Sequence, residues 1–490
     1  MSADVDVAIV GLGPVGAALA ALLARRGVSV CVAEKDGAIY PLPRAAHFDH
    51  EIMRLFQGLG IADQVLAHAR PAPAYRFQNA AGEVLMQFDM PPGASPSGWS
   101  PSYMFHQPGV ELALRGLLGG VDVRLGRRFE GLEQDGEGVT ATFAGPEGAE
   151  RVRARFMIGC DGGASAVRKA IDVSLDDYGF DEPWLVIDAR VGEGARLPDI
   201  NLQICDPERP TTCVLMGPGR HRWEFMLKPG EDPASVMDDA VIGGWLAPWG
   251  GLEHLTLERK AVYRFHGLVA QRWRCGRVFL AGDAAHQMPP FLGQGLCSGL
   301  RDAANLAWKL ADVLSGRAGD ALLDTYQPER EPNVRAIVEQ AIFMGRVVCA
   351  IDPEVARARD VQMTAARAKG EGAPRTPGVT PALAEGCILA GAPAAGRLFP
   401  QPWAGDLRLD DRLGEGAVMI TRAPWSGGGV KALALDDPAL APFRGAVERW
   451  LDDLGAKAVL VRPDRYVFGA GEPEVLAEAW SVWEREPAPA

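Results

Sequence analysis

The clearest pattern of apolar and polar positions lies at the start of the chain. Residues 5–10 are apolar except for Asp6, which predicts a buried strand. An Ala/Leu-rich stretch follows and ends at Arg25-Arg26-Gly27, as expected for a helix with basic residues in its last turn and glycine beyond it. A second apolar run, 28–33, ends at Glu34. The order strand, helix, strand predicts a βαβ unit in a parallel sheet.

Between the first strand and the helix lies the turn Gly11-Leu12-Gly13-Pro14-Val15-Gly16. Its spacing matches G-x-G-x-x-G: Gly11 permits a tight turn, Gly13 lets a diphosphate approach the backbone, and Gly16 allows close packing. Glu34 follows at the distance expected for an acid that binds ribose hydroxyls. The pattern predicts a dinucleotide site and leaves FAD and NAD as alternatives.

Two further strand ends carry similar chemistry. The apolar run 155–160 ends at Asp161-Gly162, and the run 278–281 leads into the segment Gly282–Gly295, which precedes a long amphipathic helix. In the second case a carboxylate, Asp283, stands at a strand end and two glycines stand where the helix begins. A helix N-terminus favours an anionic or polar ligand. Three such strand ends favour FAD over NAD, because an NAD site needs only the first.

The middle of the chain has a different periodicity. Residues 184–266 alternate apolar and polar positions in longer strands, which predicts a mostly antiparallel sheet in a separate layer. Residues 75–77 and 84–88 alternate in the same way and predict a hairpin. The segment 351–383 is expected to be a partial helix and a linker. In the last module, strands are expected at 408–413, 417–422 and 458–461, and a helix near 443–454.

Net charge, cysteine spacing and the lengths of apolar runs argue against several classes of function. A net charge of −13 argues against nucleic-acid binding, which needs a basic face. None of the eight cysteines forms a C-x-x-C pair, so neither a metal site nor a redox centre is expected. Cys205 and Cys213 are candidates to face each other across a turn, although reduced thiols are favoured. No signal peptide or membrane-length apolar run is evident, which predicts a cytoplasmic protein with no membrane partner.

The three strand-end motifs together resemble the fingerprints of the group A flavoprotein monooxygenases, the single-component FAD-dependent aromatic hydroxylases. Within that family, local similarity is greatest to the 3-(3-hydroxyphenyl)propionate hydroxylase branch. The segments that carry this similarity are Tyr40 to Glu51, Cys205 to Pro210, Trp223 to Met226 and Val461 to Arg465.

The resemblance implies an α/β fold with a Rossmann-like FAD-binding domain, an inserted, mostly antiparallel β-sheet substrate domain and a thioredoxin-like C-terminal domain. The FAD-binding domain would comprise residues 1–74, 104–180 and 276–350. The substrate domain would comprise a hairpin at 75–103 and a sheet at 181–275, and the C-terminal domain, after the linker 351–383, residues 384–490. Without a cysteine pair, that last domain would be structural or an assembly surface, and a homodimer is a family expectation.

The resemblance also implies the chemistry. FAD would be reduced by NADH or NADPH and react with O₂, and the resulting flavin hydroperoxide would hydroxylate a phenol, such as a 3-hydroxyphenylpropionate-like acid or a polyketide-type phenol. The alternative is a flavin reductase, an oxidase or an FAD-binding protein on the same fold without hydroxylation. The expected cofactor-binding residues are Gly11, Gly13, Pro14, Val15, Gly16, Glu34, Lys35, Arg44, Gln107, Asp161, Gly162, Gly282, Asp283, Pro289, Gly293, Gln294, Gly295 and Leu296.

Catalysis is expected to need a base beside the phenol, since a phenolate is the better nucleophile. His47 is the first candidate, because it follows Arg44 and titrates near neutrality, with Asp49 and Tyr263 as alternatives. A helix-start histidine without chemical function is an equally open interpretation of His47. Pro289 is expected beside the reactive face of the flavin.

Substrate contacts are expected on the middle sheet. An acidic substrate would need a cation, for which Arg190, Arg222 and Arg264 are candidates because arginine binds carboxylates in a bidentate manner. Trp223, Phe225 and Tyr263 are candidates for contacts with the aromatic ring, although such residues more often pack in a core.

Overall fold

The first βαβ unit forms as the sequence predicts. The computed structural model describes residues 3–91, 93, 95–371 and 380–484. Within it, β1 (Val5–Val10) leads to α1 (Pro14–Arg25) and then to β2 (Val30–Glu34), which pairs in parallel with β1. Pro14 is the first residue of the helix, where its missing N–H costs no hydrogen bond.

This unit is the centre of an eight-stranded sheet with the path β17-β18-β11-β1-β2-β8, and β10 and β9 extend it beyond β11. The pairs from β18 to β8 are parallel, so the carboxyl ends of β1, β11 and β18 meet at one edge. The three predicted strand-end motifs therefore lie together. The other strands are β8 (Asp122–Leu125), β9 (Arg128–Gln134), β10 (Val139–Gly145), β11 (Gly148–Gly159), β17 (Arg274–Cys275) and β18 (Val278–Leu280).

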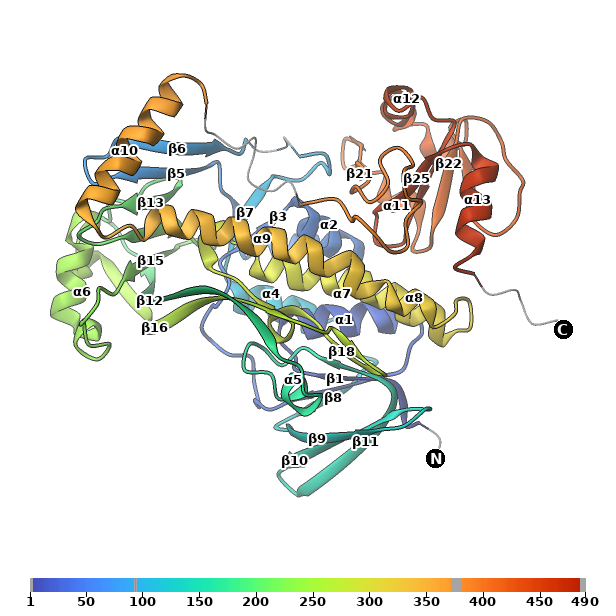
Figure 1. Ribbon diagram of the computed structural model, residues 1–490, viewed down its shortest axis with the longest axis horizontal. Helices are drawn as coiled ribbons and strands as arrows, with labels where there is room; N and C mark the ends of the chain where they lie inside the picture. Colours follow the sequence, from blue (N-terminus) through green and yellow to red (C-terminus); the bar gives the residue numbers. More distant parts are fainter. Residues whose placement is uncertain (1–2, 92, 94, 372–379, 485–490) are drawn as a thin grey trace.

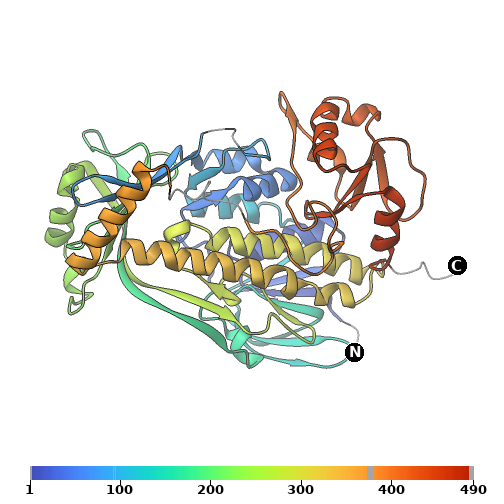
Figure 2. The ribbon, with the colours of Figure 1, turned by 45° about the horizontal axis from the view of Figure 1, so that its top comes forward.

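Two long helices, α7 (Gly295–Leu314) and α9 (Tyr326–Val348), run side by side across the middle of the molecule (Figures 1 and 2). α7 packs against α1, and its inner residues, such as Leu300 and Leu306, are fully buried in the largest hydrophobic core. The smaller helices of this part are α2 (His50–Leu59), α3 (Ala62–Leu66), α4 (Gln107–Arg115), α5 (Ala166–Ala170) and α8 (Ala321–Asp324).

The middle of the chain forms the separate sheet that its alternation predicts. Its order is β19-β16-β12-β15-β14-β13-β5-β6, and every pair is antiparallel except β13 with β5. The predicted hairpin is the β5–β6 edge of this sheet. The strands are β5 (Ala74–Asn79), β6 (Val84–Asp89), β12 (Leu175–Val191), β13 (Asn201–Cys205), β14 (Thr211–Leu215), β15 (Arg220–Met226), β16 (Leu255–Ala270) and β19 (His286–Gln287).

Two short elements flank this sheet. α6 (Asp239–Leu246) covers one face, and α10 (Pro353–Ala368) lies beside β6 at the same end of the molecule (Figure 1). α10 is the partial helix predicted in the linker, and part of that linker, 372–379, lies outside the described residues. A small sheet, β3 (His47–Asp49), β7 (Ser102–Phe105) and β4 (Ala69–Pro71), connects the two large ones.

The C-terminal domain lies at the opposite end of the molecule from α6 and is built on the mixed sheet β23-β22-β24-β25 (Figures 1 and 2). The prediction of a strand at 408–413 is wrong, because residues 410–413 form a helical turn after a two-residue strand. The elements are β20 (Trp403–Ala404), β21 (Leu407–Arg408), α11 (Asp410–Leu413), β22 (Val418–Thr421), β23 (Lys431–Ala434), α12 (Arg444–Asp453), β24 (Ala458–Val461), β25 (Val467–Gly471) and α13 (Pro473–Ser481).

A buried ion cluster fixes the C-terminal domain to α7 and α9. Glu329 of α9 accepts from Arg462 Nη2 at 2.7 Å and lies 2.8 Å from Lys309 Nζ of α7. Asp464 pairs with the same Arg462 at 2.6 Å. Because these side chains are almost fully buried, loss of one partner would leave the remaining charges unpaired in the protein interior, which is costly. The domain is therefore an integral part of this fold.

No helix of the described residues is long and apolar enough to cross a membrane. Cys205 and Cys213 are both buried free thiols.

Candidate active site

In the glycine turn, two of the three glycines have no room for a Cβ atom, whereas the third faces open space. A Cβ on Gly16 would lie 2.0 Å from the Gly11 carbonyl oxygen, and one on Gly11, which has φ +102°, would lie 2.4 Å from the Cys160 oxygen. A Cβ on Gly13 would meet nothing within 4 Å. Gly11 and Gly16 thus shape the turn, while Gly13 faces open space where a ligand can approach the backbone.

Glu34 supports this turn from the end of β2. Its Oε2 accepts from Leu12 N at 2.8 Å and its Oε1 accepts from Asp36 N at 3.0 Å. Lys35 is exposed beside it. Neither side chain borders the cavity described below, and their contacts with the adenosine half of FAD stay predictions.

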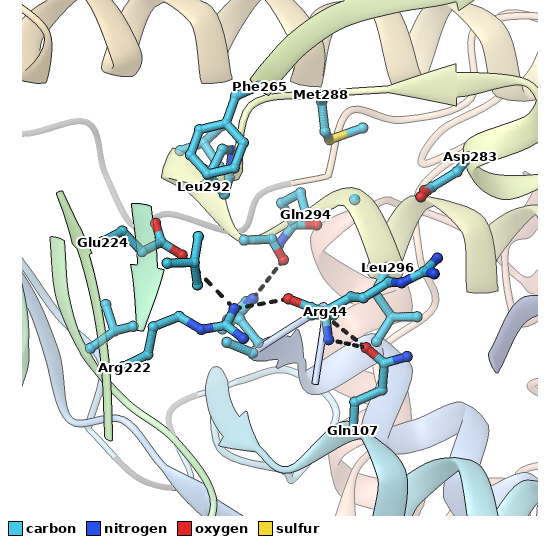
Figure 3. A pocket seen from close by; sticks show the side chains of 18 of the residues that line it. Arg44, Gln107, Arg222, Glu224, Phe265, Asp283, Met288, Leu292, Gln294 and Leu296 are labelled. Carbon is cyan, nitrogen blue, oxygen red and sulfur yellow. Dashed lines mark hydrogen bonds and ion pairs between the residues drawn. The ribbon is translucent and has the colours of Figure 1, made fainter. Parts of the chain in front are cut away.

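A cavity of about 550 Å³ extends from the glycine turn to the inner face of the middle sheet. Figure 3 shows part of its wall. Eleven of the expected cofactor residues line it: Gly13, Pro14, Val15, Arg44, Gln107, Gly162, Asp283, Gly293, Gln294, Gly295 and Leu296.

The loop that carries Arg44 is held from two sides (Figure 3). Gln107 Oε1 accepts from Arg44 N at 2.9 Å and from Ala45 N at 2.8 Å. From the sheet, Arg222 donates to the carbonyl oxygens of Arg44 at 2.8 Å and Pro43 at 2.9 Å. The backbone is fixed, while the Arg44 guanidinium is exposed and contacts only the Tyr40 ring among the described residues. Such an arginine fits a phosphate group.

Asp161 has a structural function. Its carboxylate accepts from Ser165 Oγ at 2.5 Å, Ala166 N at 2.7 Å and Val167 N at 3.1 Å, which satisfies free N–H groups at the start of α5. The following Gly162 borders the cavity with φ +81°. The motif therefore presents backbone, rather than this carboxylate, to a ligand.

The segment from Gly282 to Leu296 presents one carboxylate and one helix end to the cavity. Asp283 is exposed to it and makes no hydrogen bond or ion pair in the part of the chain that the structure describes, so its oxygens are available to a ribityl hydroxyl. α7 begins at Gly295 with Gln294 as its N-cap, and its N-terminus lies at the cavity wall. A positive helix end stabilises negative charge by about 0.3–2 kcal/mol. These features fit the flavin half of FAD.

Pro289 does not line the cavity, although the sequence analysis predicted it beside the flavin. The residues on either side, Met288 and Pro290, line the cavity, whereas Pro289 is buried behind them. The turn Pro290–Leu292 is a short 3-10 helix, and its geometry turns Pro290 toward the cavity. The expected proline contact with the flavin is therefore reassigned to Pro290.

His47 lines the cavity on β3 beside the start of α7. Its Nδ1 lies 2.9 Å from the Gly293 carbonyl oxygen. Because a carbonyl only accepts, Nδ1 carries the hydrogen and Nε2 holds a free electron pair in the neutral ring. Burial lowers the pKa of His47 below its ordinary value of 6.5, although Gly293 and Asp49 oppose this. The ring is therefore neutral near pH 7.

Asp49 is not arranged as a base. Its Oδ1 accepts from Glu51 N and Ile52 N as the N-cap of α2, and its Oδ2 accepts from Arg301 and Gln294. Burial alone would raise the pKa of Asp49, but the charges of Arg301 and the neighbouring histidines lower it overall. Its lone pairs are occupied and its basicity is low.

Three of the residues expected to contact the substrate from the middle sheet do not line the cavity. Trp223 and Phe225 are buried against α6 on the far face, because alternate residues of β15 point to opposite sides and the cavity side belongs to Arg222 and Glu224. Arg190 is largely exposed and pairs with Glu258 at 2.5 Å. Tyr263 does line the cavity, as expected. Lining residues that sequence reasoning missed include Tyr75, Gln203, Thr212, Glu224 and Phe265.

The arginines at this end of the cavity already have partners. Asp188 binds Arg222 at 2.6 and 3.0 Å and lies 3.4 Å from Arg259. Arg264 pairs with Asp181 at 2.7 Å and is more than half exposed. Each of the three therefore already lies beside a carboxylate, although Arg259 keeps a buried Nε without a hydrogen-bond partner in the described residues.

Comparisons with known proteins give the same picture. The family model described as "FAD binding domain" matches residues 4–341. A protein of Rhodococcus jostii named "Probable NADH-specific resorcinol 4-hydroxylase" is 40% identical over 99% of this chain and 97% of its own length. A "3-(3-hydroxy-phenyl)propionate/3-hydroxycinnamic acid hydroxylase" of Mycolicibacterium gilvum is 36% identical over 95% and 89%. The crystal structure of aklavinone-11 hydroxylase with FAD and aklavinone superposes with a TM-score of 0.77 at 25% identity, over 98% of this chain and 99% of that one.

Proposed function

Because this chain belongs to the family of FAD-dependent aromatic hydroxylases, we propose that its substrate is a small uncharged phenol of the resorcinol type, hydroxylated with NADH and O₂. The 40% identical relative carries the name of an NADH-specific resorcinol 4-hydroxylase. The same reaction on resorcinol, 1,3-dihydroxybenzene, would give 1,2,4-trihydroxybenzene.

The observation that carries this proposal is the charge balance at the sheet end of the cavity. Three arginines, Arg222, Arg259 and Arg264, are matched in number by three carboxyl groups, those of Asp188, Glu224 and Asp181. His47 is neutral. A substrate carboxylate placed here would be desolvated without a free cation, which is costly. An uncharged ring avoids this cost. The cavity therefore favours resorcinol over a phenylpropionate, although relatives of both names are similar to this chain.

The residues at the other end would hold the cofactor. Gly13 leaves room for a diphosphate, to which Arg44 would offer its guanidinium, and Asp283 would accept from the ribityl chain. FAD supplies hydride acceptance and oxygen activation, which no side chain of the protein can provide. The walls of the cavity exclude water, and the N-terminus of α7 favours negative charge on the flavin ring.

His47 would supply the base. With its Nδ1–H donated to Gly293, it keeps Nε2 free to take the phenolic proton and leave the ring more electron-rich. The hydrogen bond to the backbone fixes both the tautomer and the ring orientation, which a base must keep through the reaction.

Replacing His47 with asparagine is expected to lower kcat/KM for resorcinol by about 10²–10⁴-fold while FAD stays bound. Since burial lowers the pKa of His47, the wild-type ring is deprotonated at neutral pH, and activity should fall only below about pH 6.5. In the variant, this acid limb should be replaced by a rate that rises toward about pH 10, where a phenol ionises unaided. Steady-state kinetics across pH test this.

The control for His47 is His50→Asn. His50 bonds Ser97 Oγ through Nδ1 at 3.1 Å and does not line the cavity, so this variant should keep the wild-type pH profile. An unchanged profile and rate in His47→Asn would remove His47 as the base.

The proposed substrate is tested by a panel of resorcinol, phenol and 3-(3-hydroxyphenyl)propionate, with NADH and with NADPH. We expect kcat/KM for resorcinol with NADH to exceed that for the propionate by about tenfold or more, since a buried unpaired charge costs several kcal/mol. Preference for the propionate would overturn the proposal.

A further inference from the structure

Glu224 is a buried carboxyl group without a hydrogen-bond partner in the described part of the chain. It lies on β15, is 5% exposed and points into the cavity (Figure 3). Among the described residues its one ion pair is with Arg222 Nη1 at 3.8 Å, which is beyond hydrogen-bond distance. Arg222 already donates to Asp188, Pro43 and Arg44. The mechanism described above gives Glu224 no function.

The neighbours of Glu224 on the same face do not satisfy it. In the strand register, Glu224 stands opposite Thr212 of β14, and Thr212 stands opposite Gln203 of β13. Thr212 Oγ1 donates to Gln203 Oε1 at 2.8 Å, and Gln203 Nε2 donates to Tyr75 Oη at 2.5 Å. Tyr75 Oη donates onward to the Phe291 oxygen at 3.2 Å. This chain of hydrogen bonds is complete without Glu224.

A buried polar group left without a partner costs about 1–3 kcal/mol, and native proteins rarely retain one without a reason. Burial raises the pKa of Glu224, against the opposing charge of Arg222. Whether ionised or protonated, a carboxyl group can bond a hydroxyl, as acceptor in the first case and donor in the second. A ligand hydroxyl is therefore the group that best completes this site.

We infer that Glu224 is a substrate-binding residue of this enzyme and bonds the substrate hydroxyl that His47 does not deprotonate. The inference rests on the proposed function and deepens it: the site recognises a ring with two hydroxyl groups. Glu224 and His47 border the same cavity, and the inference requires one ring to contact both. A substrate carboxylate beside Glu224 is disfavoured, because two carboxyl groups in contact cannot both ionise cheaply.

The test compares resorcinol with 3-methylphenol, which has similar size but only one hydroxyl. In the wild-type holoenzyme, the ratio of the two kcat/KM values measures recognition of the second hydroxyl. Glu224→Leu should reduce this ratio by about 10–100-fold, because it removes a hydrogen bond to a charged or strongly polar group. Glu224→Gln should retain most of the ratio, since its amide still bonds a hydroxyl.

Binding gives a second readout that does not depend on turnover. The Kd of resorcinol, followed by the absorbance change of bound flavin, should rise with Glu224→Leu, whereas 3-methylphenol should bind as before. In Glu224→Gln, which removes the charge with little change of shape, 3-(3-hydroxyphenyl)propionate should bind about tenfold more tightly. The control is Glu208→Gln in the turn between β13 and β14, an 81% exposed carboxylate paired with Lys228, which should change neither ratio nor Kd.

The outcomes separate the two proposals. Wild-type oxidation of resorcinol with an unchanged ratio in Glu224→Leu would overturn the assignment of Glu224 and leave the proposed function intact. If Glu224→Leu does not fold, unchanged binding of the propionate by Glu224→Gln would overturn it equally. Failure of the wild type to oxidise or bind resorcinol would overturn the proposed function, and the assignment of Glu224 with it.

Discussion

Replacing Arg301 with leucine is expected to lower the free energy of unfolding by about 3–5 kcal/mol. Arg301 of α7 is 3% exposed and binds two carboxylates, Asp49 through Nη2 and Glu51 through Nε at 2.7 Å. It also donates to Gln294 Oε1 at 3.0 Å. The leucine variant would leave both acids buried without their cation, which is the costly half of breaking a buried ion pair.

The effect should reach the active site and the C-terminal domain. Asp49 ends the strand that carries His47, Gln294 caps the helix at the cavity, and Glu51 accepts from Tyr466 of the C-terminal domain at 2.7 Å. We therefore expect Arg301→Leu to lose FAD affinity together with stability. Denaturant titration and flavin fluorescence measure the two effects.

The matched control is Arg317→Leu. Arg317 pairs with Asp312 at 2.7 Å, but its side chain is 60% exposed, so its removal should cost about 0–1 kcal/mol. Equal effects of the two substitutions would show that the buried cluster does not stabilise the fold as described.

The second large effect is expected in the glycine turn, where two similar substitutions should behave differently. Gly16→Ala places its Cβ 2.0 Å from the Gly11 carbonyl oxygen, so the turn cannot close and both stability and FAD binding should be lost. Gly13→Ala meets no protein atom within 4 Å and has an extended backbone with φ −69°. The apoprotein should then keep its stability within about 1 kcal/mol.

The FAD affinity of the Gly13→Ala variant shows whether the diphosphate lies on this turn. If it lies on this turn, the methyl group of Gly13→Ala occupies its space, and the Kd of FAD should rise by about tenfold or more. Titration of the apoprotein with FAD, beside a thermal unfolding curve, measures this. Unchanged FAD affinity in Gly13→Ala would place the diphosphate elsewhere.

Local sequence patterns predicted most of the framework, because strand and helix periods are properties of neighbouring residues. The turn at Gly11–Gly16 and the strand end at Asp283 followed from spacing alone, and parallel pairing brought them to one edge. Nine of the eleven expected cofactor residues that line the cavity belong to the three strand-end motifs, whereas Arg44 and Gln107 were expected from the family resemblance.

The faces of the middle sheet could not be predicted in the same way. Alternation in β15 shows that Trp223 and Glu224 point to opposite sides, but not which side α6 covers. In β15 the aromatic side chains lie in the hydrophobic core, and the polar side chains of Arg222 and Glu224 line the cavity. A more useful signal was the carboxyl group of Glu224 between two aromatic residues, since a buried carboxyl group needs a reason to be there.

Ion pairs between residues far apart in the sequence could not be predicted either. Arg222 is neutralised by Asp188, 34 positions earlier in the sequence, and this pairing decides that it holds the Arg44 loop instead of a substrate carboxylate. The pairing depends on the register of β12 with β15, where these two residues are direct partners.

The measurement that tests the central claim most directly is isotope incorporation. The holoenzyme is incubated with NADH, resorcinol and ¹⁸O₂, and the products are analysed by mass spectrometry together with peroxide. We predict 1,2,4-trihydroxybenzene carrying one labelled oxygen atom, formed in near-equal amount to the NADH consumed. NADH consumption that yields only peroxide, or a product without label, would contradict the assignment of this protein as a hydroxylase of resorcinol-type phenols.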